Sequence, residues 1–183
     1  MNRKVISQGV VAKRIRKESF ACLKHVIALE GYHDDGKTSV LKTLIAELHR
    51  RDPKSWRGGR RFNPSMVRVT CERDYSAVFC YKGVIVAIKT GGDTPSVIAR
   101  NFEYFSMHHA VIGITAVKVN GENESFLAAT AYAQAETIIG FRSKTLSIRG
   151  ETLREECREM KVVKKIIAAL DVLVCEVKAN KEA

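Results

Sequence analysis

The chain has 183 residues, the length of one globular domain, and 45% of them are apolar, which is enough for a buried core. No stretch approaches the ~18 apolar residues of a membrane span, and no apolar run follows the basic N-terminus, which argues against a secretory signal. The five cysteines lack CxxC spacing, so we expect buried, reduced thiols, no zinc site and a cytoplasmic protein without a membrane partner.

The net charge of +11 is concentrated in two segments of the sequence. Residues 1–24 hold seven Lys or Arg and one Glu, whereas residues 49–61 hold six Lys or Arg and one Asp. All other residues together are neutral. We therefore expect a neutral body, with 1–24 and 49–61 as the segments through which a nucleic acid could bind. Residues 1–24 are predicted to form a basic arm or helix before a single domain over 25–183.

The first element of that domain is predicted to be a buried strand. Residues 25–30 form a short apolar run that ends at Gly31, as parallel strands often do. From Lys37 to about Arg50, apolar residues recur every three or four positions, which predicts an amphipathic helix. Residues 25–50 therefore read as strand, glycine loop and helix.

The glycine loop, residues 31–38, has the pattern GxxxxGK[ST]. Glycines let the backbone wrap around phosphates, with its N–H groups beside the positive end of the following helix. Lys37 would reach the β- and γ-phosphates, and the Thr38 hydroxyl would ligate Mg²⁺. An ordinary glycine turn explains Lys37 poorly, because a first-turn lysine opposes the helix dipole.

The sequence thus predicts a site for ATP, or another nucleoside triphosphate, with Mg²⁺. The residues predicted to surround the nucleotide are Gly31, Asp34, Asp35, Gly36, Lys37, Thr38, Ser39 and Lys118. Asp34 and Asp35 must point away from the phosphates. Lys118 follows a predicted strand and either contacts phosphate or is a solvated loop lysine.

Residues 25–50 resemble the nucleotide-binding segment of the P-loop NTPase superfamily. The run from Leu29 to Thr38 is similar to the opening of thymidylate-kinase-like nucleotide kinases. This resemblance implies phosphate binding and says nothing of a substrate. The later Asp-Arg-Tyr signature of those kinases is not matched, because Arg73-Asp74-Tyr75 has another order. The GTPase base-recognition motif Asn-Lys-x-Asp is absent, which favours ATP.

Residues 51–65 show no periodicity and contain two prolines and two glycines, so we expect a long loop. Its residues Arg57, Arg60 and Arg61 either close over the phosphates as a lid, bind a polyanion, or only keep a surface loop soluble. Strands are predicted over 66–73, 76–81 and 84–88. The last two are joined by Lys82-Gly83, a two-residue hairpin turn.

A second acid near Mg²⁺ is expected at Asp93. Because Pro95 suits the first helical position and Thr94 the N-cap, Asp93 is not needed for capping. It belongs either to the metal shell or merely to the positive end of the next helix. Glu30 is a second acid of this kind, or a buried partner of an arginine.

The remaining pattern predicts a helix from 95 to about 105, a strand over 110–115, an Ala-rich helix over 122–139, an edge strand over 142–148 and an amphipathic helix over 151–177. The alternation predicts a three-layer α/β, P-loop NTPase-like domain with a mixed, mostly parallel sheet containing one antiparallel hairpin. The apolar stripe of the last helix serves either the core or a homodimer.

The predicted function is that of a small ATPase or ATP-dependent phosphotransferase. Lys37, Asp93 and an arginine from residues 57–61 would act by positioning and by neutralising charge. The alternative is a nucleotide-gated module that binds nucleic acid or protein without phosphotransfer.

Overall fold

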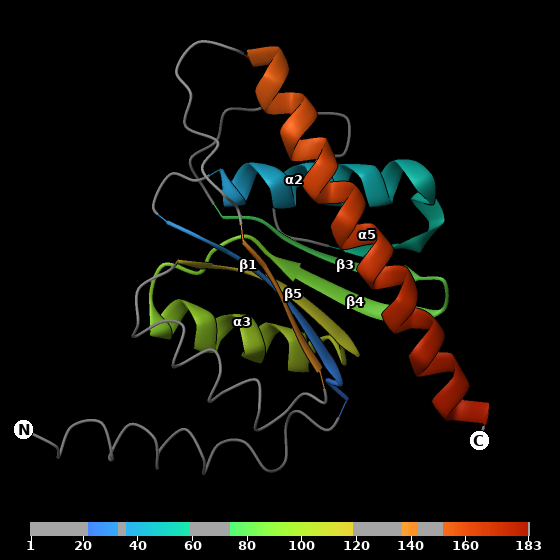
Figure 1. Cartoon of the computed structure of the whole chain (residues 1–183). Helices are drawn as coiled ribbons and strands as arrows, with labels where there is room; N and C mark the ends of the chain where they lie inside the picture. The colour runs from blue at the N-terminus through green and yellow to red at the C-terminus, as the bar shows by residue number, and fades with distance from the viewer. Residues whose placement is uncertain (1–21, 33–35, 59–73, 119–136, 143–151, 183) are drawn as a thin grey trace, which may run out of the picture.

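The computed structural model describes residues 22–32, 36–58, 74–118, 137–142 and 152–182. These residues form three layers, with helices on both faces of a six-stranded sheet (Figure 1). The elements are β1 (His25–Gly31), α2 (Lys37–Arg51), the 3-10 turn η1 (Pro53–Ser55), β2 (Trp56–Gly58), β3 (Ser76–Tyr81), β4 (Val84–Lys89), α3 (Pro95–Met107), β5 (Ile112–Lys118), β6 (Thr137–Arg142) and α5 (Thr152–Glu182).

The strand order of the sheet is β2-β3-β4-β5-β1-β6. The neighbours from β4 to β6 all pair in parallel, whereas β3 pairs antiparallel with both β2 and β4. The sheet is therefore mixed and mostly parallel, as predicted. Its antiparallel part includes the edge strand β2 as well as the predicted hairpin.

The predicted hairpin of β3 and β4 is confirmed. Its two turn residues, Lys82 and Gly83, have φ of 48° and 84°, and two positive φ values are the mark of a type I′ turn. The pairing runs from Tyr81 opposite Val84 to Ser76 opposite Lys89. The first residue of β3 therefore lies at the same edge of the sheet as the last residue of β4.

Strand alternation distributes the core over two faces of the sheet. In β1, Ile27 and Leu29 pack with α2 and α5, whereas Val26 and Ala28 pack on the side of α3. All four side chains are fully buried. A strand covered on both faces needs a continuous apolar run, which explains why 25–30 could be recognised in the sequence.

The apolar stripe of α5 packs into the core on the α2 side of the sheet. Val163, Ile167, Leu170 and Val174 are at most 3% exposed. From Val163 to Val174 the stripe therefore serves the core, one of the two roles expected of it, and a homodimer through residues 151–177 stays a prediction. None of the helices in the described ranges is long and apolar enough to cross a membrane.

The predicted loop over 51–65 is wrong for its first half. Helix α2 continues to Arg51, and the chain then forms η1 and the edge strand β2. The reason is tertiary: the Trp56 ring packs edge-on against Phe79 and His49, with centroid separations of 5.2 and 5.8 Å. Such contacts hold a strand that carries no alternating pattern of its own.

The predicted boundary between the Ala-rich helix and the last strand is also wrong. Residues 137–142 form β6, parallel to β1, instead of the end of a helix over 122–139 or the start of a strand over 142–148. The β-branched run Thr137-Ile138-Ile139 favours a strand over a helix. The rest of both predicted elements, the strand over 66–73 and residues 1–21 of the arm lie outside the described residues.

The expectation of buried thiols is wrong for two cysteines. Cys22 and Cys175 are exposed and Cys80 is partly exposed, and all three are free thiols. Cys71 and the side chain of Cys157 lie outside the described part of the chain.

Candidate functional site

The carboxyl ends of β1, β4 and β5 lie side by side, and we call this end of the strands the carboxyl edge of the sheet. These strands are parallel, and Gly31 at the end of β1 is paired with Lys118 at the end of β5. Helix α2 starts just beyond β1, and the stretch from Thr90 to Asp93 follows β4 (Figure 1). The fold therefore brings Gly31, Lys118, Lys37 and Asp93 to a single edge, where open α/β sheets bind ligands.

Helix α2 begins without the usual side-chain cap. Its N-cap residue, Gly36, has φ 70° and ψ 12°, a left-handed conformation that costs other residues roughly 1–2 kcal/mol. Gly36 has no side chain with which to bond the first-turn N–H groups, and the first turn, Lys37 to Ser39, contains no acid. The positive end of α2 thus faces the loop, as in anion-binding helices.

Lys37 is the first residue of α2, and its side chain turns back into the loop. The residue is only 8% exposed. Its Nζ donates a hydrogen bond of 3.0 Å to the carbonyl oxygen of Gly31 and another to that of Tyr32. A buried ammonium needs acceptors, and here backbone oxygens of the loop supply them. The cation is therefore fixed where the loop would enclose phosphate.

Thr38 connects the start of α2 to the chain that follows β4. Its hydroxyl Oγ1 donates to the backbone oxygen of Thr90 at 3.5 Å. A hydroxyl that donates its proton in this way keeps its lone pairs for another partner, such as a cation. The next residue, Ser39, is exposed.

The chain from Thr90 to Gly91 is held by the neighbouring chain before β3 and by helix α3. The backbone N–H of Tyr75 donates to Thr90 Oγ1 at 2.7 Å, and Thr90 N–H donates back to the Tyr75 carbonyl at 3.1 Å. From α3, the amide nitrogen of Asn101 donates to the Gly91 oxygen at 2.7 Å and to Thr115 Oγ1 at 2.8 Å. Asn101 and Thr115 are buried, which makes this a rigid support.

Gly92 lets this stretch lie directly against β5. A Cβ atom at position 92 would collide with the carbonyl oxygen of Ala116, so no other residue fits there. The Lys118 N–H donates to the Gly92 oxygen at 3.0 Å. Asp93 comes next, is exposed, and stands at the same edge as Lys37. A role for Asp93 in the metal shell requires it to lie at this carboxyl edge.

Lys118 occupies the end of β5 on the α2 side of the sheet. Ile114 and Ala116 belong to the core beneath α2, and side chains two residues apart share a face. Since Lys118 also pairs with Gly31, a second cation lies beside the start of the loop. It is the last residue of a strand rather than part of a solvated loop.

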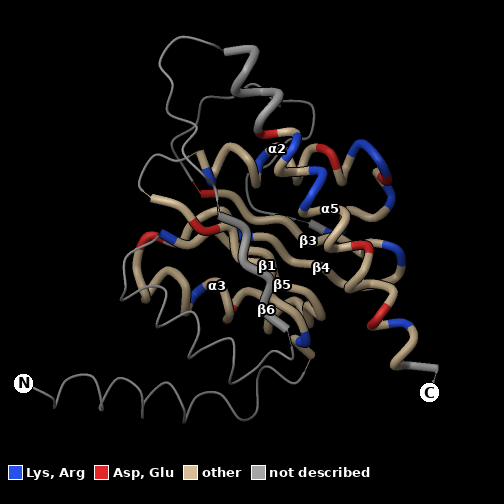
Figure 2. The backbone as a smooth tube through the Cα atoms, in the orientation of Figure 1, with Lys and Arg blue, Asp and Glu red and all other residues tan. Residues whose placement is uncertain are grey.

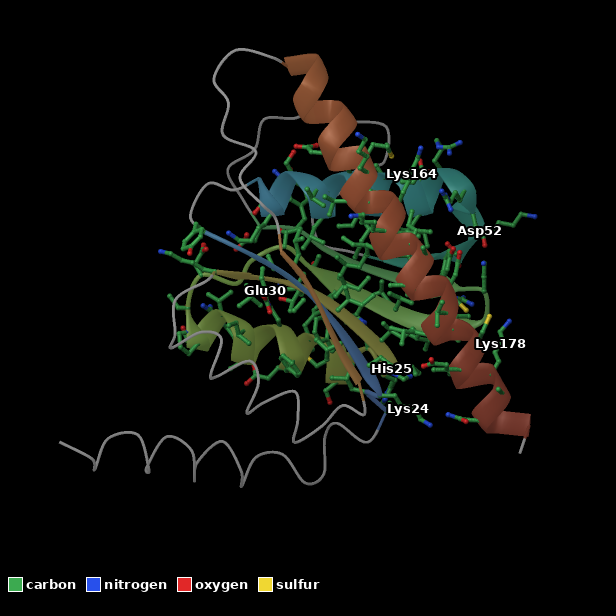
Figure 3. The ribbon with its side chains drawn as sticks, viewed as in Figure 1. Lys24, His25, Glu30, Asp52, Lys164 and Lys178 are labelled. Carbon is green, nitrogen blue, oxygen red and sulfur yellow. The ribbon has the colours of Figure 1, made fainter. Side chains whose placement is uncertain are left out.

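Glu30 faces the other layer. Val26 and Ala28 pack towards α3, so the alternation of β1 places Glu30 on that face, as Figure 3 shows. Its backbone neighbour in β6 is Arg142. This face of the sheet is opposite to α2, which does not favour a place for Glu30 beside Thr38. The expected pairing with an arginine stays a prediction, because the side chain of Arg142 lies outside the described residues.

Arg57 is not brought to the loop. It is exposed on β2, and three strands separate β2 from β1. At ~4.8 Å between strands, the lateral distance is about 19 Å, beyond the reach of an arginine side chain. Arg60, Arg61, Asp34 and Asp35 lie outside the described residues.

Asp74 is a carboxylate of this edge that sequence reasoning missed. A Cβ on Gly91 would collide with the Asp74 carboxylate, so the two residues are neighbours. The hairpin register contains the signal: with Ser76 opposite Lys89, Tyr75 lies opposite Thr90 and Asp74 opposite Gly91. Thr90 and Asn101 were missed because single polar residues carry no pattern.

No dedicated metal cage is present among the residues that the structure describes. No three His, Cys, Asp or Glu side chains gather there into a metal site. Mg²⁺ bound with nucleotide does not require one, because phosphates and waters supply most of its ligands. One hydroxyl and one carboxylate, such as Thr38 and Asp93, fit that requirement.

Comparison of the chain with protein-family models, with curated proteins and with solved structures finds no match. The assignment of this edge therefore depends on its residues and their geometry.

Proposed function

We propose that the chain binds ATP with Mg²⁺ at the carboxyl edge of the sheet and is a small ATPase or phosphotransferase of the P-loop NTPase type. The observation that carries this proposal is Lys37, a buried cation at the first position of a helix that lacks a capping side chain. Such a start is unfavourable for a helix alone and favourable for one that receives phosphate.

Each part of the edge has a role in this proposal. The loop N–H groups and the start of α2 surround the phosphates, and Lys37 places its charge on the β- and γ-oxygens. Lys118 adds a second cation beside Gly31. Thr38, oriented by its bond to the Thr90 oxygen, and Asp93 hold Mg²⁺, which neutralises phosphate charge when it is bound.

Phosphoryl transfer from such a site depends on positioning and on charge. The carboxylates of Asp74 and Asp93 stand at the same edge and could orient water or an acceptor hydroxyl. Because Arg57 lies about 19 Å away across the sheet, it has no part in this proposal.

The test is a ligand screen by thermal unfolding, followed by turnover assays. ATP with Mg²⁺ at 100 times its dissociation constant should stabilise the protein by ~2.7 kcal/mol, and EDTA should reduce that gain. Release of phosphate, or its transfer to an added acceptor, would then distinguish an enzyme from a module that only binds. Absence of stabilisation by every nucleoside di- and triphosphate would refute the proposal.

A further inference from the structure

Charge is distributed unequally between the two helical layers. Between Lys42 and Asp171, the described side chains of α2, of η1 with Asp52 before it, of the β3–β4 turn and of α5 include eight Lys or Arg and four Asp or Glu. Helix α3, on the other side, has one of each, Arg100 and Glu103. Figure 2 shows the concentration of blue residues over α2 and α5. The cations are Lys42, Arg50, Arg51, Lys54, Lys82, Lys161, Lys164 and Lys165, and we call them the basic face.

Contacts between α2 and α5 join these residues into one surface. At one end, Thr43 Oγ1 donates to Glu159 Oε2 at 3.5 Å. At the other end, the Tyr81 hydroxyl at the end of β3 donates to Asp171 of α5 at 2.8 Å. The α5 lysines from 161 to 165 lie between these two contacts and are exposed. Figure 3 shows Lys164 projecting from α5 on the side of α2.

The carboxylates of this surface hold the cations in place. Glu47 accepts bonds of 2.8 Å from both Arg50 and Arg51, and these bonds lower its pKa to about 2. Asp171 accepts from Lys82 at 2.7 Å. The Arg50 side chain nevertheless remains 73% exposed. The acids thus orient the cations without covering them, and the surface keeps its positive excess.

We propose that the basic face binds the phosphate backbone of a nucleic acid. Lys and Arg that neutralise phosphates release counterions, which gives affinity without sequence readout. Cations alone gain only ~1 kcal/mol each at an anionic membrane surface, and stable binding there adds apolar side chains that insert or a lipid anchor. A protein partner would need an apolar or aromatic core. The single large apolar side chain exposed on the described part of α5, Val172, lies just beyond the face.

This inference does not depend on nucleotide binding, because the face includes none of the residues proposed to hold the nucleotide or Mg²⁺. It also extends the predicted basic segment 49–61, because α5 adds three exposed lysines to it, Lys161, Lys164 and Lys165.

The experiment measures fluorescence anisotropy of a labelled ~20-base-pair duplex and of its single strands at salt from about 50 to 200 mM. The face variant is Lys164→Gln with Lys165→Gln in the full chain. The matched control is Arg100→Gln with Lys178→Gln, which removes the same charge elsewhere. Lys178 lies 14 residues along α5 from Lys164, or ~21 Å. Circular dichroism checks that both variants are folded.

The wild-type chain should bind either form of the nucleic acid, more weakly as salt rises. The face variant should lose roughly tenfold or more in affinity, with a salt slope smaller by ~1.8 for the duplex, whereas the control should change less than about twofold. Equal losses in both variants would mean that only net charge or the N-terminal arm matters. Such equal losses would overturn the proposal. So would an unchanged affinity of the face variant, or binding of the protein to phosphatidylserine vesicles but to no nucleic acid.

Discussion

Helices α2 and α3 have similar lengths, 15 and 13 residues, and both pack on β4 and β5, yet they begin in opposite ways. At α3, Thr94 Oγ1 accepts a hydrogen bond of 3.3 Å from the Val97 N–H, and Pro95 occupies the first turn. At α2, Gly36 offers no capping side chain and Lys37 places a cation at the positive end.

The two helix starts contribute differently to the stability of the fold. A good N-cap contributes typically ~1 kcal/mol, and a charge at the wrong end of a helix costs ~0.3–1 kcal/mol. Sequences that break a local rule in this way usually do so at functional sites. The start of α3 suits the folded chain alone, whereas the start of α2 suits a bound anion.

Asp93 directly precedes the N-cap of α3 and stands at the same edge of the sheet as the start of α2. If it belongs to the Mg²⁺ shell, Asp93→Asn should reduce turnover by roughly 100-fold and nucleotide affinity much less, because the metal neutralises developing charge. The readout is kcat and KM for ATP beside the unfolding midpoint. A loss of stability with unchanged turnover would assign Asp93 to the dipole of α3 instead.

Gly36→Ala should destabilise the free protein by roughly 1–2 kcal/mol, because φ of 70° is unfavourable for a residue with a Cβ. It should also weaken nucleotide binding by distorting the loop. Urea unfolding and a nucleotide titration measure the two effects. The control is Gly83→Ala, whose φ of 84° is similarly strained in a turn at the opposite edge. That variant should lose stability alone; comparable losses of binding would contradict the special role of Gly36.

Thr94→Ala should destabilise the protein by about 1 kcal/mol, through loss of the cap of α3. Nucleotide affinity should not change, because Thr94 contributes only to the folded chain. Thr94→Ser keeps the hydroxyl and should retain most of the stability. If Thr94→Ala impaired binding as much as folding, the division between a structural and a functional helix start would be wrong.

Of these substitutions, one at Glu47 near the C-terminal end of α2 should have the smallest effect on stability. The pKa of Glu47 falls from 4.5 to about 2, chiefly through its hydrogen bond with Arg50. A depressed folded-state pKa stabilises the protein above pH 4.5, and the gain is lost as pH falls from 4.5 towards 2. Glu47→Gln should cost only ~0.5 kcal/mol at neutral pH, since the pair is near the surface. Urea unfolding across this pH range should show the difference vanish in acid.

Local patterns explain which elements could be predicted from sequence. The strand, glycine loop and helix of residues 25–50 and the hairpin turn at Lys82-Gly83 each carry their signal within a few neighbouring residues. Strand β2 does not, because it depends on the edge-on packing of Trp56 against Phe79. Strand β6 carries only the short β-branched run at its start, and pairing with β1 fixes its place.

The residues of the candidate site also differ in whether a local pattern predicts them. The sequence motif identified Lys37 and Thr38, and the carboxyl-edge rule brought Lys118 and Asp93 to the same place. Asp74 required the hairpin register to be extended by two pairs, and the support from Asn101 required the packing of α3. Of the basic face, only the segment 49–61 could be predicted, since Arg51 and Lys161 are 110 residues apart in the chain.

The central claim, that the start of α2 is built for phosphate, is tested most directly by calorimetric titration of Mg²⁺–ATP into the wild-type protein and into Lys37→Ala. We expect binding by the wild type, no detectable binding by the variant, and a free variant that stays folded, because losing a cation opposed to the helix dipole partly offsets the lost hydrogen bonds to the Gly31 and Tyr32 oxygens. Equal affinity of the two proteins for the nucleotide would contradict the account.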